Sequence, residues 1–256
     1  MGFFKNLLKT FSSEKYRRHP EGSALTPEQF SAINVGAINA EQTMSLCDAL
    51  TTGNDVEKLK EQLRDYYGIE DAESAMATVK WFIGGGHRIA YDFIREHVAS
   101  DGAVALDLSE VDESMHETVN EYVKNLNETT EYLIHEGWIT NKADLNTLGI
   151  EGWDLGRCVL VVRSAYDCGY ISEEDAWQVI KVAHDFARTV FPDWHALAKS
   201  YVVGRAMWGG DDLMLRGINN MAKGLLEDEG SPWKAVPLQI GEPVVMDESS
   251  EATADR

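Results

Sequence analysis

Three observations predict an all-α fold, a single multi-helix bundle domain. Apolar residues recur at a helical period through most of the 256-residue chain. From residue 26 onward this pattern is punctuated by helix-start and helix-stop residues. The alternation that is typical of a strand is nearly absent, and the stretch that comes nearest, residues 236–245, contains two prolines and is predicted to be an extended tail.

Size and charge limit the classes of function. A chain of this length buries enough surface to fold without disulfides or a structural metal. Its net charge of −20 argues against direct nucleic-acid binding, because neutralising phosphates requires clustered Lys and Arg. Three cysteines, an odd number with no export signal, are typical of reduced thiols in the cytoplasm. No apolar run reaches the roughly 18 residues that span a bilayer.

Residues 1–22 are predicted to form a basic amphipathic leader helix and a linker. Residues 1–20 contain five bases and one acid, so they carry +4 and the rest of the chain −24. Such a helix suits peripheral contact with an anionic inner membrane surface through residues 1–18, or a partner's groove. Docking on its own domain is an equally weighted alternative. Its apolar face consists of Phe3, Phe4, Leu7, Leu8 and Phe11.

Capping residues define the helices of the N-terminal half. Thr26, followed by Pro27 and by Gln29 three positions on, is a capping box with a first-turn proline. Asp55 is the next N-cap, and Gly68 ends the helix that it begins. The predicted helices cover residues 26–52, 56–67, 71–84 and 87–98.

Residues 107–136 are predicted to be one long helix with an acidic outer face. They contain nine acids and a single base, Lys124, interleaved with apolar residues at a helical period. We expect this face to bind a protein partner with a basic surface. Its contact residues are expected to be Glu110, Glu113, Glu117, Glu121 and Glu128.

Four further helices are predicted in the C-terminal half. Ser172 with Asp175 resembles a capping box, and Pro192 separates two helices. The domain proper is expected to cover residues 23–238, and residues 239–256 to be an acidic disordered tail. The four helices are residues 152–168, 172–191, 193–209 and 211–226.

Ordered sequence blocks carry a family resemblance. Residues 153–157 read Trp-Asp-Leu-Gly-Arg, residues 169–177 Gly-Tyr-Ile-Ser-Glu-Glu-Asp-Ala-Trp and residues 201–208 Tyr-Val-Val-Gly-Arg-Ala-Met-Trp. With shorter blocks around residues 67–88 and 231–233, this order resembles the bacterial family catalogued as domain of unknown function 1266, over about residues 25–238 and most strongly over 153–209. The resemblance implies an all-α fold in a bacterial cytosol and brings no established activity.

The two strongest blocks share a shape that could form a site. Each places an aromatic residue, a glycine and an arginine at i, i+3 and i+4, on one face of a helix. A glycine inside a helix costs about 1 kcal/mol relative to alanine. Two of them therefore indicate either close helix contact or a ligand that approaches the backbone.

The arginines beside these glycines allow two interpretations. A buried arginine must have an anionic or carbonyl partner, so the simpler interpretation is a core salt-bridge network. The functional interpretation is a pocket for a phosphate or carboxylate, with the Trp after Ser231-Pro232 as a lid. The pocket residues would be His87, Arg88, Asp154, Arg157, Tyr201, Arg205, Trp208 and Trp233.

Familiar catalytic motifs are missing from the sequence. It contains no Gly-x-Ser-x-Gly, phosphate-binding loop or His-Glu-x-x-His motif, and its Glu113-x-x-His116 lacks the second copy that a di-iron bundle needs. We therefore expect no metal, no cofactor and no assigned catalytic residue. The leading hypothesis is a non-enzymatic interaction or regulatory module. The alternatives are an enzyme or sensor for a small anion and an acidic nucleic-acid mimic.

Overall fold

The computed structural model describes residues 15–109 and 111–241, and these ranges are α-helical with no strand. The predicted all-α fold is thereby confirmed. The helices are α2 (Pro27–Ile33), η2 (Asn34–Gly36), α3 (Ala37–Thr43), α4 (Val56–Tyr67), α5 (Ala72–Gly84), α6 (Arg88–Ala99), η3 (Glu113–Met115), α7 (His116–His135), η4 (Lys142–Asn146), α8 (Glu151–Asp167), α9 (Glu173–Val190), α10 (Trp194–Gly209), α11 (Leu213–Glu227) and α12 (Pro232–Ala235). None of the described helices is long and apolar enough to cross a membrane.

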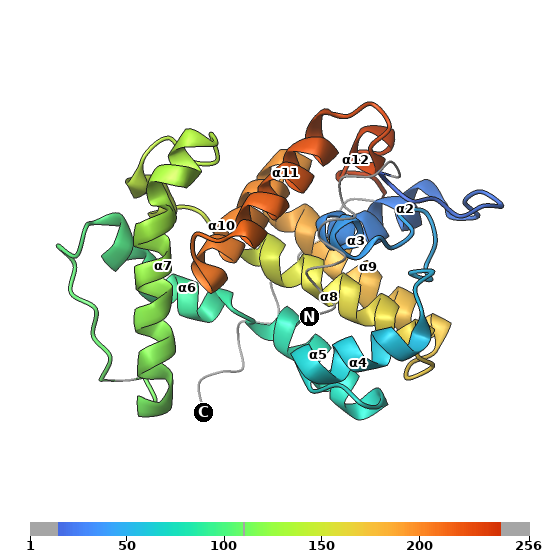
Figure 1. Ribbon diagram of the computed structural model, residues 1–256, viewed down its shortest axis with the longest axis horizontal. Helices are drawn as coiled ribbons and strands as arrows, with labels where there is room; N and C mark the ends of the chain where they lie inside the picture. The colour runs from blue at the N-terminus through green and yellow to red at the C-terminus, as the bar shows by residue number, and fades with distance from the viewer. Residues whose placement is uncertain (1–14, 110, 242–256) are drawn as a thin grey trace.

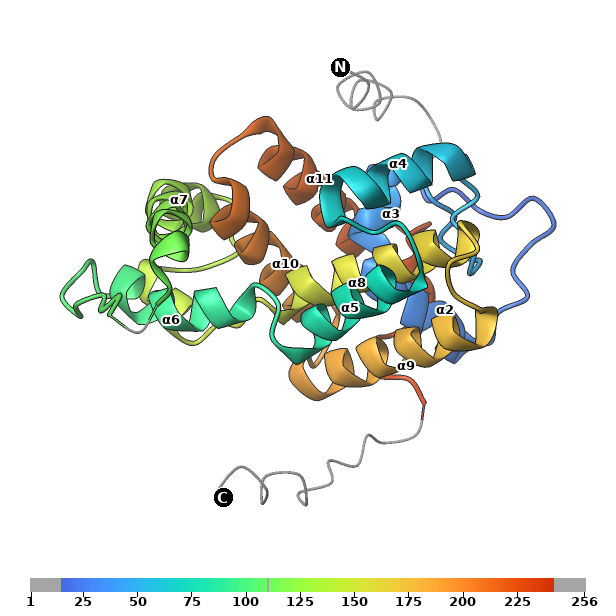
Figure 2. The ribbon, with the colours of Figure 1, turned by 90° about the horizontal axis from the view of Figure 1, so that it is seen from below.

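Helix α8 is the central element of the bundle. It packs against α10, α5, α9 and α4 (Figures 1 and 2), while α6 and α7 lie together at one end of the molecule. Twelve of the 17 residues of α8 are buried and none is fully exposed, which is why its sequence lacks a clear polar face. Its apolar side chains are divided between two core clusters: Trp153, Leu155 and Val159 join the larger one, and Cys158 and Val162 join the other.

Glycines bring α8 and α10 into close contact. A methyl group at Gly204 of α10 would overlap Trp153 of α8, and one at Gly152 of α8 would lie 2.6 Å from the carbonyl oxygen of Leu197. The backbone N–H of Gly152 also donates to the hydroxyl of Ser200 across this crossing, at 2.9 Å. Close helix contact thus accounts for Gly204, one of the two glycines that the sequence analysis singled out.

The first predicted helix is shorter than expected. Its capping box at Thr26 is confirmed, but the helical run ends at Thr43 rather than near residue 52. Met44 adopts the left-handed conformation, with φ 54°, and ends α3. Residues 44–55 instead form a loop, because their backbone groups bind side chains of α8.

Arg163 holds this loop in place. Its guanidinium is almost fully buried and donates to the carbonyl oxygens of residues 46, 49, 50 and 51. Burial lowers the pKa of Arg163 to about 10, so the side chain is still a cation at neutral pH. Asp167, one turn later, accepts from the backbone N–H of Thr52 at 2.7 Å. No motif in the sequence indicates this role of Arg163, since its binding partners are carbonyl groups distant in the chain.

The long acidic helix is also shorter than predicted. The α-helix begins at His116, after the short η3, and residues 107–112 are irregular where the structure describes them. Asp107 accepts from the backbone N–H of Ser109 and Asp112 from that of Ser114. Such local side-chain bonds compete with helical hydrogen bonds, which explains the later start.

The segment after α12 is attached to the bundle through His184. Nε2 of this buried histidine lies 3.0 Å from the Ser31 hydroxyl and 3.2 Å from the carbonyl oxygen of Leu238. The Ser31 hydroxyl donates to the carbonyl oxygen of Pro237. Burial lowers the pKa of His184 to about 4, so the native state holds this ring neutral.

We expect acid to destabilise the fold through His184. In the unfolded chain the pKa of His184 is about 6.5, so the unfolded state binds a proton at this ring more readily than the native state does. The contribution of the neutral ring to the free energy of unfolding is therefore complete above pH 6.5 and is lost as the pH falls toward 4. Between pH 7 and pH 5, wild type should lose about 2 kcal/mol more unfolding free energy than His184→Gln, measured by urea denaturation. Glu41, whose pKa is raised to about 6 by burial, acts in the opposite direction but equally in both proteins. Parallel pH profiles would contradict the assignment.

Candidate functional site

The structure brings three of the eight predicted pocket residues to one cleft. Arg157, Arg205 and Trp208 line a cavity of about 360 Å³, together with Trp153. Helices α8 and α10 supply these four side chains, α3 and α4 supply amides and tyrosines, and the start of α11 supplies Asp212. The sequence analysis did not anticipate the contribution of α3 and α4, because nothing local links residues 39–67 to residues 153–212.

Arg157 is held by aromatic rings and by His87. Its guanidinium carbon lies 4.7 Å from the ring centroid of Trp153, 5.2 Å from that of Phe82 and 5.4 Å from that of Tyr67. Its Nη1 lies 3.2 Å from Nδ1 and 3.4 Å from Nε2 of His87. No carboxylate within residues 15–109 and 111–241 forms an ion pair with it. The rings position this cation at the cleft and leave its charge without an acidic partner.

Arg205 is paired on one side only. Its Nη2 lies 2.8 Å from both carboxylate oxygens of Asp212, the N-cap of α11. The residue is 4% exposed, yet its Nη1 has no hydrogen-bond acceptor. A methyl group at Gly209 would overlap this nitrogen, so the glycine makes the conformation of Arg205 possible.

Trp153 presents a second unsatisfied donor. The residue is 6% exposed, and its indole Nε1 has no acceptor among the described residues. A buried donor without a partner costs about 1–3 kcal/mol, so native proteins rarely retain one. Other buried polar atoms of the described residues also lack a partner, Tyr201 Oη and Asn34 Oδ1 among them, but these two donors belong to side chains that line one cleft.

Asp154 does not line the cleft; it organises the turn between α5 and α6. Its fully buried carboxylate accepts from the backbone N–H groups of His87 and Arg88, at 3.1 and 3.2 Å, and from His87 Nδ1 at 3.0 Å. Gly86, at φ 60°, is required because a side chain there would overlap this carboxylate. Because Asp154 fixes the imidazole of His87, and this ring contacts Nη1 of Arg157, Asp154 and His87 together position that cation.

Arg88 also lies outside the cleft. Its guanidinium donates to the carbonyl oxygens of Phe82 and Ile83, stacks on the ring of Phe186 and lies 3.6 Å from Asp154. The salt-bridge interpretation therefore describes Arg88 and also Arg205, whose partner is Asp212, whereas Arg157 has no carboxylate partner among the described residues. The three arginines do not converge on one ligand position.

Tyr201 and Trp233 are core residues. The ring of Tyr201 packs edge-on against Trp153, with centroids 5.1 Å apart, and burial raises its pKa. Trp233 stacks on Trp194, with centroids 5.2 Å apart, and its indole N–H donates to the carbonyl oxygen of Asn34. The structure places neither residue in the lining of the cleft, so Trp233 does not act as its lid.

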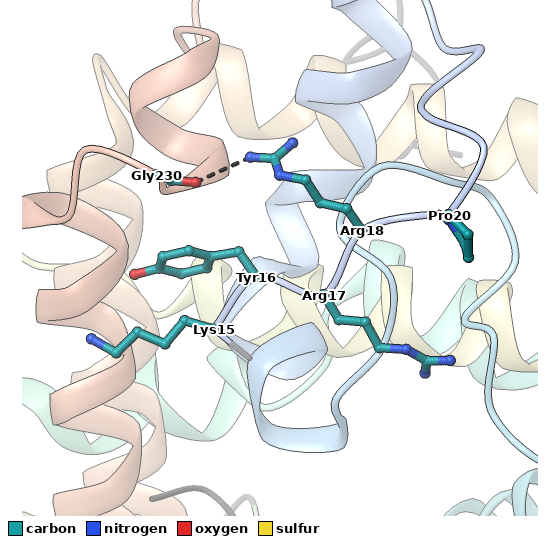
Figure 3. A pocket seen from close by; sticks show the side chains of 6 residues that line it. All are labelled: Lys15, Tyr16, Arg17, Arg18, Pro20 and Gly230. Atoms are coloured by element: carbon teal, nitrogen blue, oxygen red, sulfur yellow. Dashed lines mark hydrogen bonds between the residues drawn. The ribbon is translucent and has the colours of Figure 1, made fainter. Parts of the chain in front are cut away.

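A second, basic hollow lies where the chain enters the bundle. It measures about 570 Å³ and is lined by Lys15, Tyr16, Arg17, Arg18, Pro20 and Gly230, whose basic side chains point in different directions (Figure 3). Lys15 pairs with Asp228, Arg17 donates to the carbonyl oxygens of Met44 and Gly53, and Arg18 donates to that of Gly230. These cations have acceptors within the described chain, so their contacts anchor this segment to the bundle.

The structure tests neither of the other two predicted surfaces, the acidic face and the basic leader. Glu113, Glu117, Glu121 and Glu128 are exposed, and Glu128 lies 3.9 Å from Lys124. Glu110 and the apolar leader residues Phe3, Phe4, Leu7, Leu8 and Phe11 lie outside the described residues, as do residues 242–256. Partner binding by the acidic face and membrane contact by the leader stay predictions.

Fold and site together define an all-α domain with an arginine- and tryptophan-lined cleft at the crossing of α8 and α10. The chain belongs to the family described as protein of unknown function, DUF1266, which matches residues 62–238, more than half of its length. The match includes Tyr67, Trp153, Arg157 and Arg205, whereas the α3 wall of the cleft precedes it. No curated protein and no solved structure matches the chain.

Proposed function

We propose that this protein binds a small anionic ligand, a carboxylate or a phosphate, in the cleft between α8 and α10. The observation that carries the proposal is Arg157, a cation in the lining of the cleft that has no carboxylate partner among the described residues. Arg205 and Trp153 belong to the same lining, and each holds a buried nitrogen without an acceptor. A shift of these side chains on binding would give those nitrogens a partner on the ligand.

The energetics favour an anion over a neutral ligand. A hydrogen bond to a charged group contributes about 1.5–3 kcal/mol, roughly twice a neutral one. The aromatic rings around Arg157 lower the local dielectric and hold the guanidinium in one orientation, so little side-chain entropy is lost on binding. Because the rest of the molecule is strongly acidic, the electrostatic energy of an approaching anion would have a local minimum at this positive cleft.

We expect small anions to raise the melting temperature of the wild type, measured by differential scanning fluorimetry with acetate, benzoate and inorganic phosphate at constant ionic strength. In Arg157→Met, which keeps the apolar stem against Trp153, the dissociation constant should rise roughly 10- to 100-fold, because a charge-assisted hydrogen bond is lost.

Arg95→Met is the matched control. Arg95 lies on α6, 3.3 Å from Asp92 and outside the lining of the cleft, and its replacement removes the same unit of positive charge. The stabilisation should survive in this variant. Equal responses of the two variants would mean that the anions act through net charge, and the proposed site would then be wrong.

A further inference from the structure

We infer that the natural ligand of this cleft is a monoanionic aromatic carboxylate, a planar ring system bearing one carboxylate. This inference rests on the proposed function and specifies its ligand class. Three properties of the cleft lead to it: its net charge, the aromatic rings along it and its size.

The charge of the cleft matches one negative charge. Among the described residues that line it, Arg157, Arg205 and Asp212 are the charged ones, so its net charge is +1. Asp212 accepts from Nη2 of Arg205 and neutralises that arginine, so Arg157 is the cation of the lining without a carboxylate partner. A phosphate monoester carries between −1.5 and −2 at pH 7 and would meet the Asp212 carboxylate with uncompensated charge. A carboxylate carries −1, which equals the charge of the one unpaired cation, and its two oxygens can accept from the guanidinium of Arg157.

The rings along the cleft favour a flat apolar body on the ligand. Trp208 is 46% exposed, and its ring centroid lies 5.9 Å from that of Trp153. Tyr67 and Trp153 continue this surface beside Arg157. Several aromatic rings gathered in one lining form a contiguous apolar surface, which is typical of a binding site, and offset or edge-on ring contacts add to the area that it buries.

The size of the cleft restricts the body to one small ring system. A volume of about 360 Å³ lies at the lower end of the range for ligand sites. Such a volume fits a one- or two-ring compound. The opposite wall presents Asn39, Gln42 and Gln62, whose amides can bind polar substituents on the ring.

Isothermal titration calorimetry with four related compounds tests the ligand class. The probes are 2-naphthoate, 2-naphthyl phosphate, cyclohexanecarboxylate and 2-naphthalenemethanol. We expect 2-naphthoate to bind at least tenfold more tightly than each of the other three. The phosphate carries more than one charge, cyclohexanecarboxylate lacks the planar ring, and 2-naphthalenemethanol carries no charge. Arg157→Met should weaken 2-naphthoate binding at least tenfold.

Trp208→Ala tests the aromatic wall. This variant should raise the dissociation constant of 2-naphthoate about tenfold and change that of cyclohexanecarboxylate by less than about twofold, because only the planar ring gains from stacking. Phe93→Ala is the matched control, since Phe93 is another exposed aromatic residue, on α6 and away from the cleft. It should leave all four affinities unchanged.

The failure of this inference differs from the failure of the proposed function. Suppose that binding depends on Arg157, but 2-naphthyl phosphate binds as tightly as 2-naphthoate, or the planar and saturated carboxylates bind equally. The cleft is then an anion site, and the aromatic carboxylate is the wrong ligand class. If no probe binds, or if binding is indifferent to Arg157→Met, the proposed function itself is overturned.

Discussion

Gly204→Ala should lower the free energy of unfolding by about 3 kcal/mol, whereas Gly217→Ala should raise it by up to about 1 kcal/mol. Both glycines lie inside helices, so intrinsic propensity favours alanine at both positions. Their surroundings differ. A methyl group at Gly204 would overlap Cβ of Trp153 and lie 3.2 Å from Cβ of Ile150, while one at Gly217 meets nothing within 4 Å.

Overlap at Gly204 cannot be relieved by a side-chain rotation. The atom in conflict is the first carbon of the Trp153 side chain, so α8 and α10 must move apart along a crossing that carries much of the core. Overpacking of this kind typically costs 1–3 kcal/mol and sometimes more. Urea denaturation followed by circular dichroism measures both variants, and an unchanged midpoint for Gly204→Ala would show that the two helices are not in this contact.

Asp154→Ala should lower the free energy of unfolding by about 3–5 kcal/mol. The carboxylate is completely buried, and its removal leaves the N–H groups of His87 and Arg88 without an acceptor and Arg88 without its ion partner. Removing one member of a buried ion pair has this large effect because the other charge stays buried and uncompensated. The measurement is again urea denaturation, with Asp193→Ala as comparison.

The comparison separates this role from ordinary capping. Asp193 accepts only from the backbone N–H of Ala196 at the start of α10, so its loss should cost about 1 kcal/mol. Should Asp154→Ala keep wild-type stability and lose anion binding, Asp154 would be a ligand contact, as the sequence analysis first grouped it. We expect the opposite, with any effect on binding arising because His87 no longer orients Arg157.

Local rules explain which parts of the fold were predictable. Capping boxes and N-caps such as Thr26, Asp55 and Ser172 were located correctly, because a cap is a contact within three residues. The same locality explains the early start assigned to the acidic helix. Apolar periodicity continued through residues 107–115, but Asp107 and Asp112 bind nearby backbone N–H groups and favour turns there.

The candidate site was predictable only in part. The aromatic–glycine–arginine spacing pointed to Arg157 and Arg205, which the structure places in the lining of one cleft, since a mid-helix glycine costs stability unless its surroundings require it. The same spacing did not separate the roles of Arg88 and Asp154, because a buried cation has the same sequence pattern whether its acceptor is a carbonyl, a carboxylate or a ligand. Trp233 is a possible lid in the sequence because it follows Ser231-Pro232 outside the predicted helices, whereas in the structure it stacks on Trp194.

By itself, the sequence determined the helices, most of their ends, the family to which the chain belongs and the acidic character of its surface, because these follow from short-range periodicity, capping and composition. Only the tertiary structure decided which arginines have a carboxylate partner. That outcome depends on the crossing of α8 with α10 and on the α3 and α4 wall, contacts between residues far apart in the chain. Asp154 pairs with Arg88 and Asp212 with Arg205, whereas no carboxylate of the described residues pairs with Arg157.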